Sequence, residues 1–307
     1  MTPQHIFFAI LTAFIWGINF TAIKLSYSSF TPFSLLTVRF LATVFPLIFF
    51  VKKPDCPWSL LFKIAVFLWL GQFIFTFLAI YMGMPAGITA LVLQVQAIFT
   101  VGLTVLLYGY RPRLIEILGI LISLGGIALI GLQIEGKTNL IGFLFLLLAA
   151  LSTSFANLLY RGQKNANPLG LVVWSSLIPP IPLFILSLIF EGPTAFITSF
   201  ERLNFISGSS VLYTSYFSTI IGSSLWAYLL RNYEPARVVP FGLLVPLFSI
   251  VAAFFILSED ISFETGIAAT LIILGLLLNQ MLGHYEFGNL WTCVKGKINL
   301  IFLRKQK

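Results

Sequence analysis

Apolar residues occur along this chain in long uninterrupted runs, and polar residues are mostly confined to the short segments between them. A helix needs about 20 residues to cross roughly 30 Å of hydrocarbon, whereas a membrane β-barrel would alternate apolar and polar residues. The pattern therefore predicts an all-α integral membrane protein with ten transmembrane helices. We place them at about residues 6–27, 32–51, 60–82, 86–107, 114–133, 140–160, 169–190, 206–230, 238–257 and 264–283.

The composition supports the same class of protein. Of 307 residues, 59% are hydrophobic, 9% are charged and 32 are Phe, so the chain lacks the charged surface of a soluble domain. The first run has no basic segment before it and is too long for a signal peptide, so we expect it to remain as a helix. Cys56 and Cys293 match no metal or redox spacing. The sequence predicts no metal site and no cofactor.

The net charge of +8 is better explained by membrane topology than by nucleic-acid binding. With the N-terminus inside, only Lys137 and Arg202 fall in external loops, and Lys24 and Arg39 lie within helices. The other basic residues then face the cytoplasm, as the positive-inside rule requires. They are Lys52, Lys53, Lys63, Arg111, Arg113, Arg161, Lys164, Arg231, Arg237, Lys295, Lys297, Arg304, Lys305 and Lys307. Both termini are therefore predicted to be cytoplasmic.

One motif occurs twice, 150 positions apart. Pro85-Ala86 precedes an apolar run that ends before Arg111 and Arg113, and Pro235-Ala236 precedes a run that ends at Glu259. Basic residues follow the first run but flank the start of the second, so the motif crosses the bilayer in opposite directions. Inverted repeats of this kind are typical of secondary transporters.

The ten predicted helices divide into two repeats of five, followed by a tail. Because five is an odd number, the second repeat crosses the membrane in the opposite orientation to the first. Residues 1–135 form the first five-helix repeat, and residues 136–283 form the second, inverted five-helix repeat. Residues 284–307 form a basic cytoplasmic tail. Its apolar residues recur at three- and four-residue spacing, which fits an amphipathic helix on the inner leaflet. Two glycines weaken that helix, so a disordered basic tail is the alternative.

Two basic residues lie inside predicted helices. Lys24 ends the first helix and Arg39 lies about two turns into the second, and both approach the external face. An ionisable group in hydrocarbon is costly and usually faces a partner or a watery cavity. Together they could hold the carboxylate of a substrate. The alternatives are that Lys24 reaches the interface and that Arg39 ties helices together.

Amide side chains provide further candidates for substrate contacts. Gln94 and Gln96 stand two positions apart in one helix and are expected to point to different faces. Asn19, Gln72 and Asn157 lie in three other helices. Each could instead make a hydrogen bond between helices, which is the commoner role.

The helix at 206–230 is the most polar span and includes Tyr213 and Tyr216. Its density of hydroxyl groups indicates a wet surface. Trp16, Tyr81 and Trp174 could add aromatic walls to a small-ligand pocket. Pro246 is expected in the middle of the ninth helix, where it frees a backbone carbonyl. We interpret it as a hinge, with a static kink as the alternative.

Several kinds of chemistry are missing from the sequence. Among the ten acidic residues only Glu116 approaches a helix interior, so a relay of buried carboxylates for protons is not visible. No phosphate-binding loop occurs, and the loops are too short for an ATPase domain, so no ATPase subunit is implied. A membrane-embedded enzyme would need clustered His, Asp or Glu.

A set of short motifs spans about residues 6–283. They are Trp16-Gly17, Asn19-Phe20, Lys24, Arg39-Phe40, Pro85-Ala86-Gly87, Leu93-Gln94-Val95-Gln96-Ala97, Tyr233-Glu234, Arg237-Val238, Leu243-Leu244-Val245-Pro246 and Glu259. On these residues the chain resembles the EamA branch of the drug/metabolite transporter superfamily. It departs from the family pattern where the fourth helix ends, because Gly109 is followed by Tyr110 rather than by Glu.

The resemblance implies a cavity between two halves, alternating access, and export of amino-acid-like metabolites. The runs at 83–87 and 173–179 look closest to exporters of cysteine and O-acetylserine. We therefore expect a small zwitterionic metabolite as substrate and the lipid bilayer as the other partner. One alternative is import of a metabolite such as S-adenosylmethionine, although the acid-poor interior does not favour a cationic substrate. Another is a membrane-embedded enzyme or assembly factor.

Overall fold

The structure is a computed structural model that describes residues 1–109, 114–132, 137–160, 166–232, 238–260 and 262–283. Throughout these ranges the regular structure is helical, and no strand occurs in them. The predicted all-helical class is confirmed. The basic tail predicted at 284–307 lies outside the described residues, as does Tyr110.

The helices of the first half follow the predicted apolar runs, with breaks inside three of them. They are α1 (Pro3–Ser26), α2 (Pro32–Val44), η1 (Leu47–Phe49), α3 (Trp58–Ile64), η2 (Ala65–Gln72), α4 (Phe73–Tyr81), α5 (Ala86–Leu93), α6 (Gln96–Tyr108) and α7 (Leu114–Leu132). The segments α3, η2 and α4 form one continuous rod, because η2 is a π-helical stretch between two α-helices.

The second half repeats this arrangement and adds one short helix. Its elements are α8 (Lys137–Tyr160), α9 (Pro168–Ser175), α10 (Pro180–Phe190), α11 (Ala195–Glu201), α12 (Phe205–Leu212), η3 (Tyr213–Gly222), α13 (Ser223–Asn232), η4 (Val239–Leu243), α15 (Leu244–Leu257) and α16 (Phe263–Gly283). The π-helical η3 lies between α12 and α13, and the 3-10 helix η4 leads into α15.

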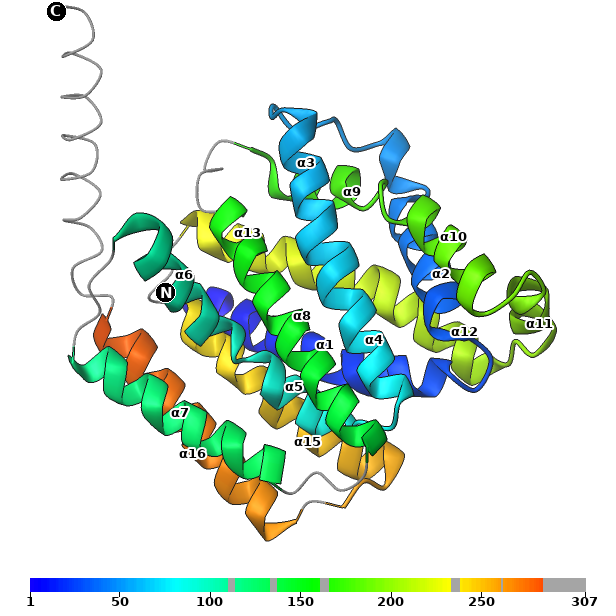
Figure 1. The fold of residues 1–307 in the computed structure, drawn as a ribbon. Helices are drawn as coiled ribbons and strands as arrows, with labels where there is room; N and C mark the ends of the chain where they lie inside the picture. The colour runs from blue at the N-terminus through cyan, green and yellow to red at the C-terminus, as the bar shows by residue number, and fades with distance from the viewer. Residues whose placement is uncertain (110–113, 133–136, 161–165, 233–237, 261, 284–307) are drawn as a thin grey trace, which may run out of the picture.

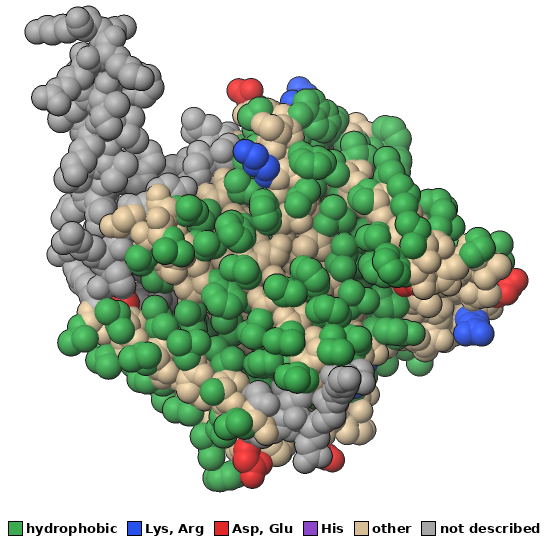
Figure 2. Space-filling model, viewed as in Figure 1, with side chains coloured by type: hydrophobic (Ala, Val, Ile, Leu, Met, Phe, Trp, Pro, Cys, Tyr) green, Lys and Arg blue, Asp and Glu red, His purple; other side chains and the backbone are tan. Residues whose placement is uncertain are grey.

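Helix length and hydropathy identify membrane spans among the described residues. Six spans are long and apolar enough to cross a bilayer: Pro3–Ser26, Pro32–Phe49, Trp58–Tyr81, Ala86–Leu107, Leu140–Leu159 and Pro168–Phe190. Three shorter apolar helices follow at Leu114–Ile130, Phe241–Leu257 and Phe263–Leu278. The predicted span at 206–230 is helical but rich in hydroxyl groups. Figure 2 shows hydrophobic side chains over most of the visible face, with charged groups mainly toward its rim. The chain is an integral membrane protein.

The two halves of the sequence are interlocked in space. α1 belongs to the first half but packs against α12, η3, α13 and α15 of the second. α8 belongs to the second half but packs against η2, α4, α5 and α6 of the first. Elsewhere α2 packs against α10, and α7 lies along α16 at one edge of the molecule (Figure 1). We call α1 with α12, η3, α13 and α15 the α1 unit, and α8 with η2, α4 and α6 the α8 unit. α5 lies between them, because it packs against α15 and α1 as well as against α8.

A carboxylate from the second half caps the start of α2. Glu191 Oε1 accepts a hydrogen bond from the Phe33 N–H at 2.6 Å, and its Oε2 accepts one from the Ser34 N–H at 3.0 Å. Ser187 donates to the same Oε2 at 2.7 Å. Because the first N–H groups of a helix have no partner within it, this carboxylate satisfies two donors and fixes α2 against α10.

Candidate functional site

Arg39 lies deep in the bundle with most of its polar edge unsatisfied. It is 1% exposed, and its guanidinium carbon lies 4.5 Å from the centre of the Phe73 ring and 5.6 Å from that of Phe77. Nη2 donates a hydrogen bond to Thr219 Oγ1 at 3.0 Å. Nε and Nη1 have no hydrogen-bond partner among the described residues. A buried guanidinium with two unused donor positions can bind an anionic group by donating hydrogen bonds to it.

The π-helical segments hold the surroundings of Arg39. Thr219 Oγ1, which accepts from Arg39, itself donates to the Thr214 carbonyl five residues earlier at 2.9 Å. Ser215 Oγ donates to the Arg39 carbonyl at 3.2 Å. η2 ends directly before Phe73, whose ring lies under the guanidinium. Wide turns of this kind occur frequently at functional sites, and here two of them flank the same arginine.

Gln94 lies at a break in one predicted span and contacts the start of another. α5 ends at Leu93 and α6 begins at Gln96, so Gln94 lies in a turn between them. Its Nε2 donates to the Gly242 carbonyl in η4 at 2.8 Å. Gly242 is four residues before Pro246, which has no N–H to donate to that carbonyl. The side chain of Gln94 therefore supplies a hydrogen bond that the proline cannot make.

Pro246 lies within the helical span predicted at 238–257, in the first turn of α15 and directly after the 3-10 helix η4. One expectation about this region is wrong. Gln94 and Gln96 do not point to different faces: Gln96 Nε2 approaches Gln94 Oε1 at 3.4 Å. The 100° step per residue does not apply because the backbone leaves the α-helix at 94–95. The role of Pro246 as a hinge stays a prediction.

Asn157 lies next to the same turn. Its Nδ2 is 3.4 Å from Thr100 Oγ1 in α6, and Ser154 Oγ donates to the Gln96 carbonyl at 2.8 Å. Asn157 is exposed and Gln96 is half-buried. The structure therefore brings three of the predicted amides together, namely Gln94, Gln96 and Asn157.

Lys24 does not join Arg39 as predicted. Its Nζ forms an ion pair with Glu259 Oε1 at 2.7 Å, and the same oxygen accepts the Ala86 N–H at 3.1 Å. The Lys24 side chain is 36% exposed and that of Glu259 is 13% exposed. The expectation failed because the partner of Lys24 is 235 residues away in sequence, where no local spacing indicates a contact.

Three predicted aromatic residues contact η3 or lie within it. Trp16 Nε1 donates to the Ser218 carbonyl at 3.1 Å. Tyr213 donates to the Ile15 carbonyl at 2.8 Å, and Tyr216 donates to the Phe45 carbonyl at 3.1 Å. Their polar atoms thus bond backbone groups of η3, of α1 and of the segment after α2. They fix η3 against its neighbours.

Trp174 and Tyr81, the other two aromatic residues predicted to line a pocket, have no described contact with Arg39. Trp174 Nε1 donates to the Val51 carbonyl at 2.9 Å, and its ring packs against Trp58. Tyr81 is 56% exposed at the end of α4 and packs edge-on against Tyr27. Both lie near helix ends, where Trp and Tyr commonly anchor a membrane protein at the interface, and neither contacts Arg39.

The remaining predicted amides differ in burial. Asn19 in α1 is buried, and its Oδ1 has no hydrogen-bond partner among the described residues. Two residues later, Thr21 is also buried, and its hydroxyl has no hydrogen-bond partner in the described part of the chain. Gln72 is half-buried at the end of η2, directly before Phe73. Asn19 is thus an acceptor available to a ligand inside the α1 unit.

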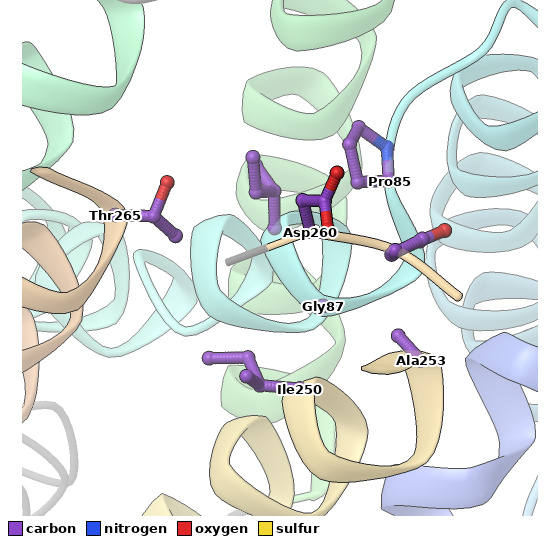
Figure 3. A pocket seen from close by; sticks show the side chains of 8 residues that line it. Pro85, Gly87, Ile250, Ala253, Asp260 and Thr265 are labelled. Carbon is purple, nitrogen blue, oxygen red and sulfur yellow. The ribbon is translucent and has the colours of Figure 1, made fainter. Parts of the chain in front are cut away.

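A pocket opens between the start of α5 and the end of α15. Figure 3 shows Pro85 and Gly87 of the first segment and Ile250 and Ala253 of α15 around it. The full set of lining residues is Pro85, Gly87, Ile88, Ile250, Ala253, Glu259, Asp260 and Thr265. None of the residues predicted to bind substrate is in this set. It marks the contact between the packing units rather than the surroundings of Arg39.

The ends of the two duplicated spans correct the alignment of the repeat. The residue that follows α6 is Gly109, with φ 64°, and the residue that follows α15 is Ser258, with φ 53°. Both residues adopt the left-handed conformation that commonly terminates a helix. Gly109 therefore corresponds to Ser258, and Glu259 corresponds to Tyr110 rather than to Gly109.

Sequence reasoning missed several residues around Arg39 and the helix ends. Thr219, Phe73 and Phe77 surround the guanidinium, and Glu191 caps α2. Phe is too common in this chain to stand out, with 32 occurrences. Glu191 had a detectable signal, since it is a rare acid at the end of an apolar run.

The comparisons with known proteins agree with this architecture. The model of the EamA-like transporter family matches residues 4–132 and again residues 140–281. The chain belongs to the EamA-like transporter family. It is a membrane transporter and not an enzyme, so the resemblance found in the sequence is confirmed. The boundaries predicted for the two repeats, at 135 and 136, stay a prediction.

Curated relatives cover most of the chain. It is 36% identical over 280 residues to a protein of Escherichia coli K12 named "Probable amino-acid metabolite efflux pump", covering 88% of this chain and 93% of the relative. A protein of Salmonella typhimurium with the same name is 36% identical over 285 residues, covering 91% and 95%. An "Uncharacterized inner membrane transporter YedA" of Escherichia coli K12 is 27% identical, covering 89% of each chain.

The fold has also been observed in a solved crystal structure. That chain is 18% identical and superimposes with a TM-score of 0.63, covering 91% of this chain and 98% of the solved one. At this level of identity the likeness concerns the fold alone.

Proposed function

We propose that this transporter exports small amino-acid-like metabolites across the bacterial inner membrane by alternating access. The names of the Escherichia coli and Salmonella relatives support export of amino-acid metabolites, and YedA is named an inner membrane transporter. The topology that we propose has ten transmembrane helices in two inverted repeats, with both termini in the cytoplasm. The face that carries Lys24 and the start of α2 is then external.

The observation that carries this proposal is the unsatisfied guanidinium of Arg39. A helix-tying arginine would be expected to use most of its five donors, because buried polar groups are normally hydrogen-bonded. Arg39 bonds one hydroxyl, and its Nε and Nη1 remain unpaired among the described residues. The carboxylate of an amino acid would supply the missing acceptor with a charge-assisted bond.

The chemistry around Arg39 favours a small neutral amino acid. The side chains with described contacts to its guanidinium, Thr219, Phe73 and Phe77, include no acidic group. A zwitterion therefore fits better than a cation such as S-adenosylmethionine. We propose cysteine or O-acetylserine as substrate. Arg39 binds the carboxylate, and Gln96 and Asn157 contact the remaining polar groups. Gln94 is already bonded to Gly242 and acts mainly by holding η4.

The moving bodies are proposed to be the α1 unit and the α8 unit. We do not propose that the two sequence halves rock as rigid bodies, because the first helix of each half packs mainly against helices of the other half. Relative rotation of the two packing units would instead expose the space between α5–α6 and α15 alternately to each side. This retains the prediction of alternating access and changes which helices move together.

The test is counterflow of radiolabelled cysteine or O-acetylserine in proteoliposomes that contain the purified transporter. The wild type is expected to accumulate label, and Arg39→Gln to lose at least about tenfold in rate, as expected for loss of a charged hydrogen bond. Arg202→Gln is the matched control, because Arg202 is exposed after α11. Folded wild type without exchange of any neutral amino acid would refute the substrate class. Full activity of Arg39→Gln would remove Arg39 from the site.

A further inference from the structure

The π-helical segments η2 and η3 occupy equivalent places in the two repeats. Each lies inside the third predicted span of its half, with an α-helix directly before and after it. Gly71 corresponds to Gly222, and Val66 to Phe217, since both pairs are 151 positions apart. A Cβ added to Gly71 would lie 3.2 Å from the Val66 carbonyl oxygen, and one added to Gly222 would lie 3.4 Å from that of Phe217. Both segments thus have the same local geometry around the glycine.

Each glycine accommodates a side chain from the first helix of the other half. A Cβ added to Gly222 would lie 2.7 Å from Trp16 Nε1 in α1, and one added to Gly71 would overlap Ser152 Oγ in α8. Trp16 is the fourteenth residue of α1 and Ser152 is the sixteenth of α8, and both helices contain 24 residues. Small residues allow such close approach between membrane helices. The same contact therefore occurs twice, near the middle of both helices.

Both side chains donate to a main-chain carbonyl four residues before the glycine. Trp16 Nε1 donates to the Ser218 carbonyl at 3.1 Å, and Ser152 Oγ donates to the Phe67 carbonyl at 2.7 Å. In a π-helix the main-chain bonds span five residues instead of four, and a helix bends where its ladder is widened or a side chain enters it. We call the Trp16–Ser218 bond the η3 clamp and the Ser152–Phe67 bond the η2 clamp.

Each clamp lies close in the chain to a residue that contacts Arg39. Ser218 directly precedes Thr219, whose Oγ1 accepts from Arg39 Nη2 at 3.0 Å. Within η2, the ring of Trp69 packs against that of Phe73, with centroids 5.7 Å apart. The Phe73 ring centre lies 4.5 Å from the guanidinium carbon. A shift of η3 therefore moves the hydroxyl that bonds Arg39, and a shift of η2 moves the ring beneath it.

Thr219 and Phe73 belong to different packing units. Thr219 lies in η3 of the α1 unit, and Phe73 begins α4 of the α8 unit. Arg39 comes from α2, which is in neither unit. Its guanidinium lies between a hydroxyl of one unit and an aromatic ring of the other, with Nε and Nη1 unpaired among the described residues. Each unit thus supplies one wall of the Arg39 site and clamps the π-helical segment next to that wall.

We infer that Trp16 and Ser152 are equivalent positioning residues, which fix the two walls of the Arg39 site through η3 and η2. The inference rests on the role in substrate binding that is proposed above for Arg39. Neither side chain needs to touch the substrate, because each acts on the backbone of a π-helical segment. Loss of either donor should loosen only the wall that it holds.

The experiment measures the accessibility of Arg39 in the purified transporter without substrate. Phenylglyoxal modifies arginine side chains, and the rate at Arg39 is followed by mass spectrometry of its peptide. Modification of the wild type should be slow, because Arg39 is 1% exposed. Trp16→Phe and Ser152→Ala each remove one donor. Each should raise the rate about threefold or more, the factor for an average hydrogen bond between membrane helices.

Trp174→Phe and Thr153→Val are the matched controls. Trp174 donates an indole bond of the same kind to the Val51 carbonyl at 2.9 Å, and Thr153 bonds a carbonyl of its own helix at 2.9 Å. Both variants should modify Arg39 at the wild-type rate. Ser152→Cys keeps a weaker donor and should give a rate between those of the wild type and Ser152→Ala.

Two further measurements distinguish positioning from general loosening. In hydrogen exchange, Trp16→Phe should accelerate residues 213–222 and not 65–72, and Ser152→Ala should do the reverse. Thr219→Val removes the hydroxyl that accepts from Arg39. In that background Trp16→Phe should add little to the modification rate, whereas Ser152→Ala should keep its full effect, as expected when only the first pair acts through one contact.

Several results would overturn the inference. They are an unchanged Arg39 rate in both Trp16→Phe and Ser152→Ala with wild-type elution in gel filtration, an equal increase in Trp174→Phe, and full additivity of Trp16→Phe with Thr219→Val. An unchanged half-saturating concentration of cysteine in counterflow, in variants whose Arg39 is modified faster, would also overturn it. Because the modification assay uses no substrate, a wild type that exchanges no neutral amino acid would refute the proposed function without affecting the Arg39 rates.

Discussion

The bond between Gln94 and Gly242 gives the sharpest test of how the transporter is held together. Gln94→Leu removes the donor while keeping a side chain of similar size. The Gly242 carbonyl then loses the 2.8 Å bond and retains a contact from the Leu244 N–H at the end of η4. Hydrogen bonds between membrane helices contribute about 0.6 kcal/mol on average and up to about 1.7. We expect a loss of about 1 kcal/mol in the free energy of unfolding.

The second step restores a donor in another way. Pro246→Ala returns an N–H at the position from which an α-helix would bond Gly242, four residues earlier. In the Gln94→Leu background this change should recover about half of the lost stability or more. The double-mutant cycle should therefore show a coupling energy of at least about 0.5 kcal/mol. In the wild-type background the same change should have a smaller effect, because the carbonyl is already bonded.

The assay is reversible unfolding of the purified protein in mixed detergent micelles. Pro182→Ala is the matched control, because Pro182 is the third residue of α10 just as Pro246 is the third residue of α15. It should not rescue Gln94→Leu. If the two proline variants rescue equally, or if Gln94→Leu is as stable as the wild type, Gln94 does not substitute for the main-chain bond.

Three further outcomes follow from particular contacts. Glu191→Ala should destabilise the protein by about 1–2 kcal/mol, because two N–H groups of α2 lose their cap. Glu201→Ala, a change of an exposed acid at the end of α11, should not. Equal unfolding midpoints of the two variants would contradict this role of Glu191. Gly275→Ala should cost about 1–3 kcal/mol by overpacking, because its Cβ would lie against α7 backbone, whereas the Cβ of Gly266→Ala meets open space; the difference is measured by thermal unfolding. Trp174→Phe should leave the counterflow rate unchanged, since its indole bonds a loop carbonyl, and a loss of transport without loss of folded protein would place it in the site.

The helix positions were predictable because they depend on short-range information. A run of apolar residues from 86 to 107 is sufficient to indicate a span, and the structure contains helix across it. Its internal turn at 94–95 was not predictable in the same way, since Gln94 leaves the helix to reach η4 of the other repeat. Helix propensity describes the local chain, and this bond is made 148 positions away in sequence.

The polar site was only partly predictable for a related reason. Arg39 was recognised because any charge in an apolar run is unusual, and it is indeed buried. The partner of Lys24 could not be assigned from sequence because Glu259 had no local relation to it. Trp174 could not be assigned from sequence, since an indole has the same appearance there whether it faces a cavity or an interface. In the structure it bonds the Val51 carbonyl, and its place in the substrate site stays a prediction.

The exchange of α1 and α8 between the repeats has a consequence for biosynthesis. α1 leaves the ribosome first, yet its packing partners α12, η3, α13 and α15 are made last. Glu259 is synthesised 235 residues after Lys24, which takes about 10–50 s at typical rates of translation. During that interval the nascent chain holds a cationic helix in the membrane without its counter-ion. Premature termination before residue 259 would leave that charge permanently unpaired, and such products are expected to be recognised by membrane quality control.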